Sequence, residues 1–241
     1  MTDDAAQPLA DPPEGHRDSA LQDGALQDGA LRILLICGST RAASTNLAVL
    51  RTVREVAPDA VPTDAVTADA MTADAMTADA VTADAVTADA VTAVLYEGLA
   101  GLPAFNPDND GENAPAAVTD LRRELAAADA VIFCTPEYAG TLPGSLKNLL
   151  DWTVGSGDLY GKPVAWINAA NEGRGDGAQA TLTMVLAYVG AAVIEDACLR
   201  LPDARDAVGP DGLIHDPGIR ELVARSVEQI ARHVRAAADR L

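Results

Sequence analysis

Cysteine is scarce in this chain of 241 residues, and long hydrophobic runs are missing. The three cysteines, Cys37, Cys134 and Cys198, are odd in number and widely spaced, which argues against a disulfide framework and against CxxC zinc ligands. The acidic N-terminus lacks the apolar core of a secretory signal, and the longest nearly apolar run, 182–194, is too short to span a bilayer. We therefore expect a cytoplasmic protein with no membrane partner.

Basic residues are also few. Lysine and arginine together number 17 against 36 aspartates and glutamates, which gives a formal net charge of −19. Nucleic-acid binding needs clustered basic side chains, so this composition argues against a nucleic-acid partner. The acidity is concentrated in two segments. Residues 1–30 hold seven acidic side chains and one arginine, and residues 61–93 hold six aspartates and no basic residue.

Both acidic segments have low sequence complexity. Residues 1–30 are rich in Asp, Pro, Gly and Gln, which predicts a disordered acidic tail. Residues 61–91 repeat the pentad "VTADA" or "MTADA". Residues five positions apart are rotated by about 140° around a helix and lie on opposite faces of a strand. Neither a helix nor a strand would therefore give this repeat a constant buried side. A pentapeptide β-helix would need a large inward residue where the pentad has alanine. We expect a low-complexity insertion within a domain spanning 31–241.

The remainder of the chain alternates between short apolar runs and amphipathic stretches. Strands are expected at 31–37, 92–96, 130–134, 163–168 and within 191–199. Helices are expected at 46–57, 115–128, 142–153, 179–190 and 219–241. Right-handed crossovers convert this order into an α/β three-layer sandwich with a parallel sheet. We predict a flavodoxin-like sheet of five strands in the order 2-1-3-4-5, with a ligand at the carboxyl ends of strands one and three.

The loop "GSTRAASTN", 38–46, lies between the first strand and the first helix. Gly38 permits close backbone approach, and a helix N-terminus favours an anion. Ser39, Arg41, Ser44 and Asn46 add hydrogen-bond donors, so the loop predicts a phosphate site. A Walker loop is excluded because no lysine is present, and a Cys-x5-Arg phosphatase loop is excluded by Ala43. The simpler alternative is a polar turn that caps the helix.

Two further loops are expected at the same edge of the sheet. The segment "CTPEYAGTLPGSLKNLLDW", 134–152, contains two prolines and two glycines that stiffen a surface on which a flat ring could lie. Its apolar residues, among them Leu149, Leu150 and Trp152, form either a packed helix face or a subunit interface. The third loop, 169–178, is rich in glycine and is expected to close over a bound ring.

The motif "GSTRxxSxN" after the first strand and "PEYAGTLPGSLKNLLDW" after the third together resemble the NAD(P)H-dependent FMN reductase family, which includes quinone, azo-dye and chromate reductases. "YGKPVAWINAA" and "VLAYVGAAVI" follow in the family's order. Many relatives carry Asn where this chain has Ala139. By this resemblance the FMN phosphate would be held by Ser39, Arg41, Ser44 and Asn46, and the isoalloxazine would lie against Pro136, Glu137, Tyr138 and Ala139.

The resemblance implies an NAD(P)H-dependent reductase in which bound FMN passes electrons to a quinone-like small-molecule acceptor. No catalytic side chain and no metal are expected, because the cofactor carries the chemistry. The family is often dimeric or tetrameric, with the helix after "PGSLKN" at the interface. Two alternatives remain: a non-enzymatic electron carrier of the flavodoxin type, and a family member that binds no flavin.

Overall fold

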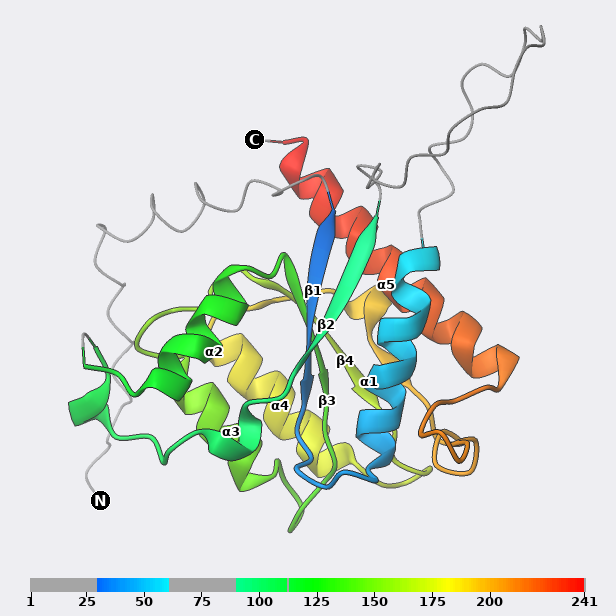
Figure 1. Ribbon diagram of the computed structural model, residues 1–241, viewed down its shortest axis with the longest axis horizontal. Helices are drawn as coiled ribbons and strands as arrows, with labels where there is room; N and C mark the ends of the chain where they lie inside the picture. Colours follow the sequence, from blue (N-terminus) through cyan, green and yellow to red (C-terminus); the bar gives the residue numbers. More distant parts are fainter. Residues whose placement is uncertain (1–29, 61–89, 112, 241) are drawn as a thin grey trace, which may run out of the picture.

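The computed structural model describes residues 30–60, 90–111 and 113–240 (Figure 1). Nearly all of the expected acidic tail and pentad insertion lies outside these ranges, so both remain expectations. Within the described ranges, the chain folds around one parallel sheet with helices on both faces. Its strands are β1 (Leu31–Cys37), β2 (Val91–Tyr96), β3 (Ala130–Cys134), β4 (Pro163–Asn168), β5 (Ala192–Val193) and β6 (Leu199–Arg200).

The strand order is β2-β1-β3-β4-β5, which confirms the predicted flavodoxin-like topology. The fifth position differs in detail from the prediction. It is shared by β5 and β6, which both pair with β4 and are separated by the 3-10 turn Glu195–Ala197. Each piece is two residues long, which explains why the pattern of 191–199 did not place a single strand.

The central strand β1 is buried on both faces, as its continuous apolar run predicts. Ile33, Leu35 and Cys37 belong to one hydrophobic core, and Leu34 and Ile36 belong to the other. This alternation follows from the two-residue repeat of a strand. The sheet therefore separates two cores, and its helices are divided between them.

The helices are α1 (Thr45–Val56), α2 (Ala116–Ala126), α3 (Gly144–Trp152), α4 (Asp176–Tyr188) and α5 (Pro217–Ala238). Helices α1 and α5 cover one face of the sheet, and α2, α3 and α4 cover the other (Figure 1). None of the helices in the described ranges combines the length and the apolar character that crossing a membrane requires.

Two helices begin earlier than expected because of local capping. Helix α4 begins at Asp176 and not at 179, after Gly175 adopts a left-handed conformation with φ 82°. Helix α5 begins at Pro217 and not at 219, because the Asp216 carboxylate accepts a hydrogen bond of 2.9 Å from the Ile219 amide. Proline suits the first helical position because its missing N–H is not needed there.

Of the two alternatives for Leu149, Leu150 and Trp152, the structure supports the packed helix face. All three side chains are almost completely buried within the chain, in the core beneath α2, α3 and α4. The Trp152 Nε1 donates a hydrogen bond of 2.9 Å to the Pro103 carbonyl, and the indole meets the Phe105 ring edge-on at 5.0 Å. These three side chains therefore pack within their own chain.

Deleting residues 61–89 is expected to leave FMN binding unchanged. The residues that follow this segment enter β2 at Val91, which pairs with Leu31 at the amino end of β1. The candidate site described below follows Cys37, at the opposite end of the same strand. Comparing the FMN dissociation constants of the full chain and the deletion variant, joined by a short Gly/Ser linker, checks this expectation. Weaker FMN binding by the variant would contradict it.

Candidate functional site

A cavity of about 650 Å³ opens where the carboxyl ends of β1, β3 and β4 meet. All three loops that the sequence places at this edge contribute to its walls. The lining comprises Ser39, Arg41, Ser44, Thr45, Asn46, Thr135, Pro136, Glu137, Tyr138, Gly140, Ala169, Ala170, Asn171, Gly173, Arg174, Gly175, Asp176, Gly177 and Arg205. Its volume lies within the range typical of cofactor sites.

Gly38 fixes the first loop tightly against the second. Its amide donates a hydrogen bond of 2.9 Å to the Cys134 carbonyl. A Cβ atom at this position would lie 2.1 Å from Thr135 Oγ1 and 2.6 Å from Thr135 Cβ, so no side chain fits. The first loop therefore leaves the sheet beside the second, and both reach the cavity together.

The N-terminus of α1 faces the cavity with unused donor capacity. Ser44 occupies the N-cap position, but its side chain makes no capping hydrogen bond, and the first turn contains no acidic residue. Both Ser44 and Asn46 are mostly buried and line the cavity. Because a helix N-terminus carries a partial positive charge and free amides, this arrangement suits an anion.

Arg41 is the cationic side chain of the first loop. Its Nε and Nη2 atoms donate to the Ala43 carbonyl at 3.2 and 2.7 Å, which holds the guanidinium over its own loop. Its amide donates to Ser39 Oγ at 3.3 Å. No carboxylate of the described residues pairs with Arg41, so its other donors are available to a ligand.

Two cysteines end the neighbouring strands below the cavity. Cys37 and Cys134 are register partners, and Cys134 Sγ donates to Asn46 Oδ1 at 3.3 Å. Burial raises the pKa of the Cys37 thiol and raises that of Cys134 well above its ordinary value. Both thiols therefore stay protonated and act as core residues, since the thiolate is the reactive form.

The second loop folds into a tight turn at Tyr138–Thr141. The amides of Tyr138 and Thr141 donate to each other's carbonyls at 2.9 and 3.1 Å. The two central residues, Ala139 and Gly140, have φ angles of 50° and 75°, the pattern of a type I′ turn. Among the described residues, Ala139 alone adopts a positive φ without being glycine.

Replacing Ala139 with asparagine is expected to raise the free energy of unfolding by about 0.5 to 1 kcal/mol. A left-handed conformation is costly for alanine, whereas asparagine adopts it readily through local hydrogen bonding. Denaturant unfolding of the protein without FMN measures the change. Ala42→Asn is the control, because Ala42 lies in an exposed turn without a positive φ. Equal stability of Ala139→Asn and the parent chain would show that the turn is not strained.

Glu137 joins the second loop to the third through its side chain. One carboxylate oxygen accepts hydrogen bonds from the amides of Gly177 and Ala178, at 2.8 and 3.3 Å, in the first turn of α4. Thr141 and Thr181 add a hydroxyl contact of 2.8 Å between the same two segments. The family resemblance places Glu137 against the isoalloxazine ring, and the structure adds its role as a helix cap.

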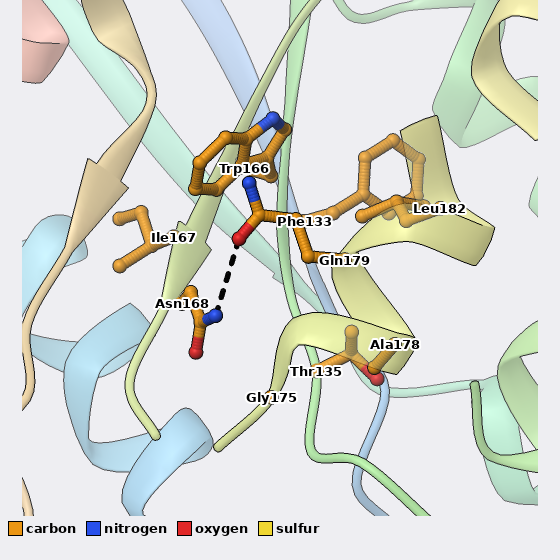
Figure 2. A pocket seen from close by; sticks show the side chains of 9 residues that line it. All are labelled: Phe133, Thr135, Trp166, Ile167, Asn168, Gly175, Ala178, Gln179 and Leu182. Atoms are coloured by element: carbon orange, nitrogen blue, oxygen red, sulfur yellow. Dashed lines mark hydrogen bonds between the residues drawn. The ribbon is translucent and has the colours of Figure 1, made fainter. Parts of the chain in front are cut away.

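The third loop is anchored to the end of β4. Asn168 Nδ2 donates to Gln179 Oε1 at 3.2 Å (Figure 2). Asn168 Oδ1 accepts from the Ala170 amide at 3.0 Å. A second cavity lies beside these side chains, between β3, β4 and α4 (Figure 2). Its volume of about 10 Å³ suits one water molecule and excludes an organic ligand.

Seven of the eight predicted site residues line the large cavity, and Ala139 does not. The sequence analysis missed two arginines that also line it, Arg174 and Arg205. Arg174 lies in the predicted glycine-rich loop, so its positive charge at the site could have been recognised from the sequence. Arg205 follows β6, and only a correct placement of the fifth strand would have brought it to this edge.

The arrangement combines an anion cradle on the first loop with a stiff second loop and a glycine-rich third loop along the same cavity. In a flavodoxin-like sheet, this combination defines a flavoprotein of the oxidoreductase class. Residues 31–206 match the family described as NADPH-dependent FMN reductase, and the chain belongs to that family. It is therefore an oxidoreductase with FMN and NAD(P)H as its cofactors.

Individual relatives agree with this assignment. An NAD(P)H-dependent FMN reductase of Pseudomonas aeruginosa is 31% identical over 141 residues, which cover 57% of this chain and 76% of that protein. A quinone reductase of Pseudomonas putida is 26% identical over 176 residues, 71% of this chain and 75% of the relative. The solved structure of FerB, an NAD(P)H:(acceptor) oxidoreductase from Paracoccus denitrificans, has a TM-score of 0.62 at 23% identity and covers 86% of this chain and 98% of FerB, which supports the fold.

Proposed function

We propose that this enzyme uses NAD(P)H and bound FMN to reduce a quinone-like small-molecule acceptor. This proposal rests on one observation: three loops at the carboxyl edge of the sheet surround a cavity that has an anion cradle on one wall. Quinone reductases among the relatives support the acceptor class.

The residues present fit FMN. Ser39, Arg41, Ser44 and Asn46 would hold its phosphate at the N-terminus of α1, where no acidic residue competes. The backbone of 136–139 would lie against the isoalloxazine ring, with Tyr138 half-exposed beside it. When bound, FMN supplies the hydride and electron-transfer chemistry, and the chain contributes binding, orientation and electrostatics.

Steady-state oxidation of NADPH and NADH by the FMN-loaded protein, with 1,4-benzoquinone as acceptor, tests this function. Turnover that requires both FMN and the quinone is the expected result. A protein that retains FMN but oxidises neither nucleotide would be an electron carrier, and the proposal would then be wrong. A protein that shows no flavin absorbance after incubation with FMN and removal of the unbound FMN would be a family member without flavin.

We also propose that the enzyme forms a homodimer or homotetramer through the outer face of α4. Met184 and Tyr188 lie one turn apart on this helix and are 65% and 69% exposed. Tyr160, 67% exposed, lies against Gly190 just beyond the helix. No charged residue occurs between 177 and 194. An uncharged, apolar outer helix face suits an interface between subunits.

The double substitution Met184→Lys with Tyr188→Glu is expected to convert the oligomer to monomers, because it places charges in the proposed interface. Light scattering coupled to size-exclusion chromatography measures the mass. Leu222→Lys is the matched control, since Leu222 is an exposed apolar residue on α5, in the opposite helix layer. An unchanged mass for the double variant, or a monomeric parent chain, would refute the α4 interface.

A cytoplasmic location is proposed on the basis of the cysteines. Cys37, Cys134 and Cys198 are all free thiols, and the first two are buried in the core. Free thiols of this kind are typical of a reducing compartment.

A further inference from the structure

The charged side chains of the cavity do not balance one another. Three arginines line it, Arg41, Arg174 and Arg205, and none has an ion-pair partner among the described residues. The two carboxylates of the lining are both engaged. Glu137 caps α4, and Asp176 pairs with Arg200 at 2.8 Å. The cavity is therefore positive within a chain of net charge −19.

The backbone next to Arg174 and Arg205 is held in place by hydrogen bonds and burial. Arg174 lies between Gly173 and Gly175, which have φ angles of 72° and 82°, and its amide donates to the Asn171 carbonyl at 3.0 Å. Arg205 directly follows Ala204, which is completely buried. The preceding turn is fixed by the Leu201 amide, which donates to the Asn168 carbonyl at 2.8 Å. Both loops thus hold an arginine at the cavity without pairing it to protein.

The first loop already accounts for one anion. Arg41, Ser44 and the N-terminus of α1 form the cradle assigned to the FMN phosphate. The N-terminus of α4 is not available as another anion site, because the Glu137 carboxylate occupies its first amides. Arg174 and Arg205 are therefore not needed to bind the flavin phosphate. Arg174 lies in the third loop, and Arg205 lies in the segment after β6.

Besides FMN, the proposed reaction brings two ligands into this cavity, the reducing dinucleotide and the quinone acceptor. The reducing dinucleotide always carries negatively charged phosphates, whereas a quinone needs no charge at all. Arginine binds phosphate through a planar fork of donors, often with two hydrogen bonds at once. We propose that Arg174 and Arg205 form a second anion subsite, separate from the flavin phosphate site, that binds phosphate groups of NAD(P)H. This inference rests on the proposed function.

Isothermal titration of the FMN-loaded protein tests the subsite without turnover. The probes are ADP-ribose and 2′-phospho-ADP-ribose, which carry the dinucleotide's phosphates and lack its nicotinamide. The double variant Arg174→Ala with Arg205→Ala is expected to bind 2′-phospho-ADP-ribose at least tenfold more weakly, with an unchanged affinity for FMN. Arg54→Ala is the control, because Arg54 is exposed on α1 and lies outside the cavity.

The two probes separate the two sources of phosphate. A loss confined to 2′-phospho-ADP-ribose assigns the arginines to the 2′-phosphate, and an equal loss with both probes assigns them to the pyrophosphate. Either result supports the subsite. Steady-state kinetics should then show a raised KM for the dinucleotide with kcat nearly unchanged.

Three results would overturn the inference. The first is unchanged probe affinity in the double variant, or no probe binding by the FMN-loaded parent. The second is a loss of FMN affinity in place of probe affinity, which would place the arginines at the flavin phosphate. The third is a KM of the double variant that is raised for an anionic quinone but not for the dinucleotide. Failure of the proposed function is distinguishable, because it appears in the parent chain as absent FMN or absent turnover.

Discussion

Replacing Arg41 with alanine is expected to weaken FMN binding about 10- to 150-fold. The guanidinium is held over the first loop by the Ala43 carbonyl, and its other donors have no carboxylate partner among the described residues. A charge-assisted hydrogen bond to a phosphate is worth about 1.5 to 3 kcal/mol, which corresponds to this factor. Fluorescence titration of the flavin-free protein with FMN measures the dissociation constant.

Riboflavin provides the sharpest control for this variant, because it has the same ring and no phosphate. Parent and Arg41→Ala chains should bind riboflavin equally if the arginine contacts the phosphate. Lys147→Ala should bind FMN like the parent, since Lys147 pairs with Asp151 on α3 and does not line the cavity. Equal FMN retention by Arg41→Ala and Lys147→Ala would count against the phosphate assignment.

Replacing Glu137 with alanine is expected to lower the free energy of unfolding by about 1 to 2 kcal/mol in the absence of FMN. The substitution removes the acceptor for the amides of Gly177 and Ala178, which then lose their cap at the start of α4. The favourable interaction of a carboxylate with the helix dipole is lost as well. Chemical denaturation of the flavin-free chain measures the difference.

Two variants bracket the interpretation of this result. Glu137→Gln keeps an oxygen acceptor and should recover part of the lost stability. Glu172→Ala removes a carboxylate from the third loop that makes no hydrogen bond or ion pair with the described residues, and should leave stability unchanged. If Glu137→Ala unfolds like the parent chain, the side chain does not act as a cap.

The fold was predictable because its signals are local. The apolar run 31–37 indicated a strand buried on both faces, and the structure divides its residues between two cores. Alternation of such runs with helical spacing, together with the handedness of crossovers, indicated a parallel sheet with helices on both faces, and the order 2-1-3-4-5 was chosen as a common order of such sheets. The fifth position was less clear, since β5 and β6 are each too short to carry a periodic pattern.

The site was predictable only where topology brings loops together. Carboxyl ends of parallel strands share one edge, so Ser39 and Pro136 could be placed in one cavity from the sequence. The hydrogen-bond partners of the side chains within these loops were not predictable. The capping role of Glu137 depends on where α4 begins, and α4 begins three residues earlier than its pattern indicated.

The two alternatives for the apolar residues of α3 could not be separated from the sequence for a related reason. An apolar stripe shows that a helix face is covered, but not whether the chain or a second subunit covers it. Leu149 and Trp152 are covered by their own chain. On α4, by contrast, apolar residues continue around to the exposed face at Met184 and Tyr188, which is the basis of the proposed interface.

The hydrogen bond between the Gly38 amide and the Cys134 carbonyl has a consequence for how the flavin is taken up. This bond ties the first loop to the second, and the Glu137 carboxylate ties the second loop to the third. These intramolecular contacts preorganise the cradle, so FMN binding carries a smaller entropic cost of ordering the three loops. Such an apoprotein should be refilled by simple addition of FMN, in one rapid phase without a slow folding step.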